Sequence, residues 1–148
     1  MKPRLFISAK ETKQLTDRIA SFEKLVGCEL VFHFRRKLGP DPENANKALF
    51  HKFKLHETSD HRAILITLAL QEKKFAVWVD EGVEKYGGQI LHDNIGKHLK
   101  EHLSQSRHLE ALLGVVDIAE KALKNSKSSS HKANEIPNEP IIEDREES

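Results

Sequence analysis

Three carboxylates follow the most apolar run of the chain, and their spacing is the first sign of chemistry. Phe75–Val79 is continuous in apolar residues, and Asp80, Glu81 and Glu84 come next, with Gly82 allowing a tight backbone turn. Closely spaced carboxylates and backbone carbonyls are the oxygen ligands that Ca²⁺ and Mg²⁺ prefer. A solvated strand end beside the first turn of a helix would also carry such acids. The local pattern therefore leaves a cation site and a simple surface loop both open.

A second polar cluster precedes the other long apolar run, in the segment "HETSDHRAIL". It consists of Thr58, Ser59, Asp60, His61 and Arg62. Its hydroxyls and carboxylate suit a metal or a phosphate, and an arginine offers forked donors to oxyanions. Loops gather the same residue types for solubility alone, so this cluster also has two interpretations.

The segment "HLKEH" matches a pattern in which two histidines one helical turn apart hold zinc. The spacing puts His98 and His102 on one face of a helix. Leu99 and Leu103 define the core face of that helix, so we expect the histidines to point outward into solvent. A zinc protease would also need a third ligand on a packed downstream scaffold, and the sequence provides only one more helix and a polar tail.

The composition fits a single domain with one core. The chain has 148 residues, 38% of them hydrophobic and 32% charged. The 24 basic and 23 acidic residues nearly cancel, and no basic concentration indicates nucleic-acid binding. A single cysteine, Cys28, rules out a disulfide framework within the chain. With no signal peptide and no span-length apolar segment, we expect a cytoplasmic protein without membrane insertion.

Hydrophobic periodicity predicts the elements that must position these residues. Ser8 and Glu11 have capping-box spacing ahead of a helix over residues 9 to 25, and Gly27 suits its end. Residues 28 to 35 alternate as a strand, and Asp41 before Pro42 is typical of a helix start. The runs at 63 to 70 and 75 to 79 predict an antiparallel β-hairpin.

Two further helices are expected, one from residue 90 to 103 and one over 107 to 124. The order of elements predicts an α/β fold, a three-layer α/β/α sandwich with a small mixed sheet that includes the hairpin. The domain should cover residues 1 to 124. Residues 125 to 148 are polar, proline-punctuated and acidic, which predicts a disordered tail.

Three phrases of the sequence resemble the TPM domain family, which includes a thylakoid-lumen acid phosphatase. They are "FEKLVGCEL" before the first strand, "TSDHRAILITLAL" into the second, and "EKKFAVWVDEGV" through the third. The resemblance spans roughly residues 9 to 124 and implies an α/β/α sandwich. It also implies divalent-cation binding, notably of calcium, and acid phosphatase activity in some members, whereas others act in assembly or repair.

The resemblance carries over to particular residues. It matches Glu29 to an acid that opens the first strand, Thr58 to a threonine before the second, and Asp80 to the exit of the third. Glu84 lies near a further acid of the family pattern. The chain departs from the family where His61-Arg62-Ala63 stands in place of the usual Arg-Asn-Gly, and it resembles the short cytosolic branch without signal peptide or anchor.

We therefore hypothesise a TPM-like domain that binds a divalent cation, Ca²⁺ before Mg²⁺, and that could also hydrolyse phosphomonoesters. The expected cation ligands are Asp80, Glu84, Asp60 and Glu29, and the expected phosphate-binding residues are Arg62 and Thr58. Catalytic residues are not assigned. The alternative is a non-catalytic interaction or assembly module, whose acidic tail engages a protein partner.

Overall fold

The first long helix begins and ends where the sequence predicts. In the computed structural model, which describes residues 2–126 and 136–144, α1 runs over Ala9–Val26. The Ser8 hydroxyl accepts a hydrogen bond from the Glu11 backbone N–H, and the Glu11 carboxylate accepts one from the Ser8 N–H. Gly27 ends the helix in the left-handed conformation, with φ at 70°, which costs a glycine little. Both ends of α1 are therefore set by residues within one turn of them.

In the described part of the chain, four strands form one mixed sheet, in the spatial order β3-β2-β1-β4. Their bounds are Glu29–Arg35 for β1, Ala63–Ala69 for β2, Lys74–Val79 for β3 and Ile141–Ile142 for β4. β1 and β2 are parallel, with Glu29 opposite Ala63, because a helical crossover connects them. β2 and β3 are antiparallel, as the predicted hairpin requires.

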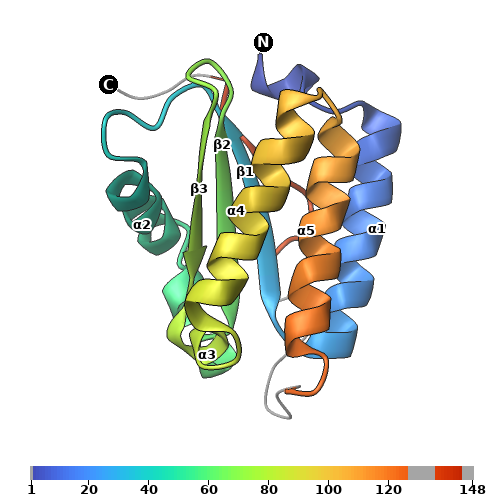
Figure 1. Ribbon diagram of the computed structural model, residues 1–148, viewed down its shortest axis with the longest axis vertical. Helices are drawn as coiled ribbons and strands as arrows, with labels where there is room; N and C mark the ends of the chain where they lie inside the picture. Colours follow the sequence, from blue (N-terminus) through green and yellow to red (C-terminus); the bar gives the residue numbers. More distant parts are fainter. Residues whose placement is uncertain (1, 127–135, 145–148) are drawn as a thin grey trace.

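Helices cover both faces of this sheet (Figure 1), which confirms the predicted three-layer α/β/α sandwich. α1 lies on one face together with α4 and α5, and α2 lies on the other. The remaining bounds are Pro42–Lys52 for α2, Glu81–Glu84 for α3, Gly88–Ser104 for α4 and His108–Leu123 for α5, with short 3₁₀ turns at Pro3–Leu5, Leu55–Glu57 and Ser59–His61. No helix in the described part of the chain is both long and apolar enough to cross a bilayer.

Side chains along the strands point alternately into two separate hydrophobic cores, one on each face of the sheet. Leu30, Phe32 and Phe34 of β1 point into the larger core beneath α1, α4 and α5. Val31 of β1 and Leu65 of β2 point into the smaller core beneath α2. Both faces of β1 and β2 are therefore dry, which explains why their sequences are nearly continuous in apolar residues.

The C-terminal segment corrects the expectation of a tail disordered from residue 125. Ile141 and Ile142 pair in parallel with His33 and Phe34, and the Glu143 N–H donates to the Phe34 carbonyl at 2.9 Å. The otherwise open edge of β1 offers unpaired backbone groups, and β4 satisfies some of them. Three isoleucines looked too few to form a packed segment, but backbone pairing at a sheet edge needs little apolar surface. The rest of the predicted tail, 127–135 and 145–148, lies outside the described residues.

Candidate functional site

The two clusters that the sequence singled out meet at one end of the sheet. β1 and β2 start at this end and the antiparallel β3 finishes there. The Asp80 N–H donates to the Ala63 carbonyl at 3.0 Å, which holds the exit of β3 beside the entrance of β2. We call the four acids gathered here, Asp60, Asp80, Glu81 and Glu84, the acidic end.

Gly82 is required at the acidic end by close packing. A Cβ at this position would lie 2.0 Å from the backbone oxygen of Asp60 and 2.6 Å from that of His61. The sequence suggested a glycine for a tight turn, but Gly82 is not among the glycines with positive φ. A glycine is required here for lack of space, because α3 packs directly against the loop before β2. Only a residue without a side chain allows the two clusters to meet.

Asp80 is the most constrained carboxylate of the acidic end. It caps α3, with Oδ1 accepting from the Glu81 N–H at 2.9 Å. Its other oxygen, Oδ2, is buried and has no hydrogen-bond partner among the described residues. Burial raises the pKa of Asp80, since a desolvated carboxylate holds its proton more strongly. A buried oxygen without a donor is unusual and indicates that a cationic partner would be favourable there.

His61, a member of the second polar cluster of the sequence, lies beside Asp80, and two further histidines lie behind it. His61 Nδ1 lies 3.8 Å from Asp80 Oδ2, and His61 Nε2 lies 3.9 Å from Glu81 Oε1. The ring is oriented by the Nδ1–H, which donates to the His56 carbonyl at 3.1 Å. His56 in turn packs against His51 of α2, with ring centroids 4.7 Å apart. Spacings of five residues match no ligand motif, so only the fold shows that His51 and His56 lie near His61.

The other expected cation ligands lie in different surroundings. Asp60 and Glu84 are exposed at the acidic end, and the Glu84 N–H donates to the Asp80 carbonyl at 2.9 Å. Glu29 is fully buried, and its Oε1 accepts from the Ile136 N–H at 2.8 Å. Glu29 therefore holds the returning C-terminal segment. In the described parts of the chain, no three His, Cys, Asp or Glu side chains are already arranged to hold a metal ion.

The expected phosphate-binding residues make structural contacts. Arg62 is 3% exposed and donates from Nε to the Gly27 carbonyl at 2.8 Å and from Nη2 to the Val26 carbonyl at 3.1 Å. These carbonyls end α1 and have no helical partner, so Arg62 completes that terminus. The Thr58 hydroxyl donates to the Leu55 carbonyl at 3.0 Å. Both side chains shape the loop that carries Asp60.

The two histidines of "HLKEH" lie between α4 and α5, half-buried, where full exposure was expected. Their rings are in contact, with centroids 4.0 Å apart and planes tilted by 33°. His98 Nε2 donates to the Glu110 carbonyl at 3.2 Å, and His102 Nδ1 donates to the His98 carbonyl at 3.0 Å. Each ring thus uses a nitrogen to bind backbone. They face inward because Gly114 leaves room for the ring of His98.

A buried polar cluster lies on the α2 side of the sheet, and no sequence pattern indicates it. His33 of β1 has no exposed surface, and its Nδ1 lies 3.2 Å from the Thr67 hydroxyl. The Thr67 hydroxyl donates to Asn46 Oδ1 at 2.6 Å, and Asn46 Nδ2 donates to the Leu65 carbonyl at 3.2 Å. His33 Nε2 contacts the Glu143 carboxylate. These pairings join residues far apart in the sequence, so no local spacing announces them.

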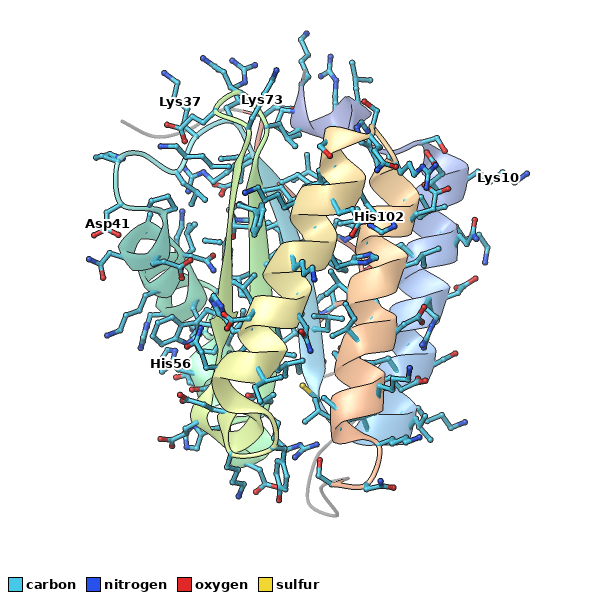
Figure 2. All side chains as sticks on the ribbon, viewed as in Figure 1. Lys10, Lys37, Asp41, His56, Lys73 and His102 are labelled. Atoms are coloured by element: carbon cyan, nitrogen blue, oxygen red, sulfur yellow. The ribbon has the colours of Figure 1, made fainter. Side chains whose placement is uncertain are left out.

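The acidic end and the tip of the β2–β3 hairpin lie far apart in the molecule (Figure 2). His56, beside the acidic end, lies at one end of the molecule, and Lys37 and Lys73 lie at the other. The acidic end and the tip of the β2–β3 hairpin therefore lie at opposite ends of the sheet.

Comparison with known proteins gives one family and several similar folds. A family model described as the TPM domain matches residues 2–122. No curated protein matches the chain. The solved structure of the BA42 protein from the psychrophilic bacterium Bizionia argentinensis superposes with a TM-score of 0.82 at 22% identity, covering 92% of this chain and 94% of that one.

Two more solution structures share the fold at lower identity. The N-terminal domain of a protein from P. gingivalis has a TM-score of 0.67 at 16% identity, covering 83% of this chain and 86% of that one. The N-terminal domain of the cg2496 protein from Corynebacterium glutamicum has a TM-score of 0.66 at 13% identity, with 96% and 84% covered. At these identities the likeness concerns the fold.

Proposed function

The chain belongs to the TPM domain family, and on this premise we propose that it binds a divalent cation at the acidic end, Ca²⁺ before Mg²⁺. The observation that carries the proposal is Asp80 Oδ2, a buried carboxylate oxygen without a hydrogen-bond partner in the described residues. Burying a carboxylate oxygen without a donor is costly, and a bound cation would remove that cost.

Neighbouring oxygens complete the proposed ligand set. Asp60 and Glu84 are exposed and lie on the two segments that pack at Gly82, and the proposal adds their carboxylates to Asp80 around the cation. An all-oxygen set with adjustable carboxylates suits Ca²⁺, which accepts six to eight ligands in flexible geometry, better than Mg²⁺. Glu29 Oε1 accepts from the Ile136 N–H, and its Oε2, like Asp80 Oδ2, is buried without a hydrogen-bond partner in the described residues, so Glu29 is left outside this first set.

Phosphomonoesterase activity is the catalytic form of the proposal. A divalent cation supplies polarisation of a phosphoryl oxygen and activation of water. Asp80 and Glu84 would hold that cation, and His61 offers a ring nitrogen, Nε2, at the open side of the cluster. Arg62 donates to the Val26 and Gly27 carbonyls and thereby orients the loop before β2. In this proposal its part in phosphate binding is indirect.

A non-catalytic interaction module is the competing function, and the docking of β4 favours it. Ile141 and Ile142 show that the edge of β1 accepts an added strand. A partner that presents an extended segment would bind the same backbone groups by displacing β4. This function requires neither Asp80 nor a cation, which separates the two possibilities by experiment.

The deciding experiment compares two helix-capping aspartates. Asp80→Asn removes the charge and keeps a capping oxygen, and Asp41→Asn does the same at the start of α2, where Asp41 Oδ1 accepts from the Asn44 N–H. In a Ca²⁺ titration followed by amide NMR, the wild type and Asp41→Asn should shift at residues 60 and 80 to 84. Asp80→Asn should bind at least about tenfold more weakly. Equal affinities of the two variants would reject the site.

The catalytic form is tested by turnover of p-nitrophenyl phosphate with and without a chelator. Activity should need added cation and should fall in Asp80→Asn but not in Asp41→Asn. Cation binding without turnover in any condition would leave a binding domain and reject the phosphatase.

A further inference from the structure

A pocket of about 540 Å³ opens at the end of the sheet opposite the acidic end. It lies between the β2–β3 hairpin, the last turn of α4 and the segment after the first 3₁₀ turn. We call it the hairpin pocket. Its volume falls in the range of small-ligand sites, roughly 300–1,000 Å³. The acidic end lies where β2 begins, so the length of a seven-residue strand, about 23 Å, separates the two.

The wall of the hairpin pocket is apolar. It is lined by Phe6, Leu68, Leu70, Phe75 and Leu103. Phe6 and Leu68 belong to the main core, whereas Leu70, Phe75 and Leu103 are only partly buried against it. The core is thus open to solvent at this point. Apolar surface in a concave site is available to a ligand, and covering it would be favourable.

Phe6 is held firmly on one side of the hairpin pocket. Its ring stacks on His108 with centroids 4.2 Å apart, and His108 Nδ1–H donates to the Phe6 carbonyl at 2.9 Å. Phe6 also packs against Phe34 at 5.0 Å. The apolar wall is therefore built before any ligand arrives, which lowers the entropic cost of binding.

The rim of the hairpin pocket is cationic. Lys73, Lys74 and Lys100 line it, and no aspartate or glutamate does. Lys74 donates to the Gly39 carbonyl at 3.3 Å. Within the described residues, neither Lys73 nor Lys100 has an ion-pair partner, and both are exposed. Figure 2 shows Lys73 at the tip of the hairpin. Unpaired cations over a low-dielectric wall attract an anion.

A pocket with an apolar wall and a rim of lysines favours a ligand that has an apolar part and a negative charge. We propose that the hairpin pocket binds a small amphiphilic anion, an alkyl chain that ends in a carboxylate or a phosphate. The chain covers the partly buried wall at Phe75 and Leu103, and the head lies between Lys73 and Lys100. Lysine is a point charge without the forked geometry of arginine, so both kinds of head group are accepted.

A second hollow shows that this combination is particular to the hairpin pocket. The groove between α4 and α5, about 500 Å³, is lined by Lys97 and Lys121 but also by Glu101. Its charges are mixed in sign, and it is more open, so it selects no anion. The proposal also stands independently of the cation site, because it uses none of the acidic-end residues.

The test uses decanoate below its micelle concentration, followed by amide NMR of the full chain. Saturable shifts should appear at residues 68 to 75 and 103 to 108. Decanol, which has the same chain without charge, should bind at least about tenfold more weakly. Decyl phosphate should bind at the same residues as decanoate. Failure of decanoate to saturate, or equal binding of decanol, would overturn the proposal.

Charge reversal locates the head group. Lys73→Glu/Lys100→Glu should weaken decanoate binding at least about tenfold, and the matched double variant Lys10→Glu/Lys24→Glu on α1 should change it less than about twofold. All four lysines are exposed, and the unliganded spectra verify the fold of each variant. Equal losses in both doubles would mean a general charge effect and reject the site. Binding to phosphatidylglycerol vesicles without decanoate shifts would replace the small ligand with a membrane surface.

Discussion

Glu143 contacts the ring of His33, a side chain without exposed surface in the middle of β1, and thereby ties the C-terminal segment to the sheet. The same segment is fixed at its start by Glu29, which accepts from the Ile136 N–H, and at its end by Arg4, which lies 3.7 Å from Asp144. The buried side chains of Glu29 and His33 and the exposed Arg4 thus bind residues that composition alone would assign to a tail.

Removal of the Glu143 charge should loosen this segment. Glu143→Gln exchanges a charged contact with His33 for a neutral one and should lower the free energy of unfolding by about 1 kcal/mol. Hydrogen exchange at the amides of residues 141 to 143 should accelerate. Glu139→Gln is the control, because Glu139 is exposed in the same segment. Unchanged protection in Glu143→Gln would show that backbone pairing alone holds β4.

Stability should fall in acid because of His33. Burial lowers the pKa of His33 from 6.5 to about 4, although Glu143 raises it in part. At a pH between 4 and 6.5, His33 is protonated in the unfolded chain and neutral in the folded chain. The free energy of unfolding therefore decreases as the pH falls through this range. We expect His33 to contribute a loss on the order of 2 kcal/mol from pH 7 to 4.

Urea titrations over that pH range check the His33 prediction. His33→Gln should be less stable at pH 7 and should show a flatter dependence on pH than the wild type. Parallel pH profiles of the two proteins would assign the acid sensitivity to other groups.

Gly82→Ala should be strongly destabilising. Its Cβ would meet two backbone oxygens, of Asp60 at 2.0 Å and of His61 at 2.6 Å, and backbone cannot give way as a flexible side chain can. We expect a loss of about 3 kcal/mol, or displacement of α3 together with loss of cation binding. Thermal unfolding measures the first effect.

Gly96→Ala in α4 is the matched control for Gly82→Ala. The added methyl would meet only Phe75 Cε1 at 3.7 Å, an ordinary contact. Alanine favours helix over glycine, so this variant should gain about 0.5–1 kcal/mol. Similar effects of both changes would mean that the contact at Gly82 relaxes easily.

Arg62→Lys tests whether Arg62 is structural. A lysine cannot reproduce two directed bonds to the Val26 and Gly27 carbonyls, so unfolding should become easier by about 2 kcal/mol. The exposed Arg107→Lys should have little effect. A fully stable Arg62→Lys whose only defect is weaker phosphate binding would favour the ligand role instead.

The sequence determined the elements whose signals lie within a few residues. The Ser8–Glu11 capping box, Gly27 and Asp41 mark helix ends through contacts made within one turn. The apolar runs predicted the hairpin and the dry faces of the sheet, and the acids after β3 were expected beside the loop before β2. Periodicity and capping are local, so they can be recognised before the chain folds.

Only the tertiary structure decided which distant residues contact the buried polar groups. Glu29 Oε1 accepts from the Ile136 N–H, 107 positions away, and His33 meets Glu143 across 110 positions. Arg62 donates to carbonyls at the end of α1, a contact that its place in the sequence does not indicate. A buried polar group takes whichever partner the packed chain brings within reach, and that choice depends on strand order, which has no local signal.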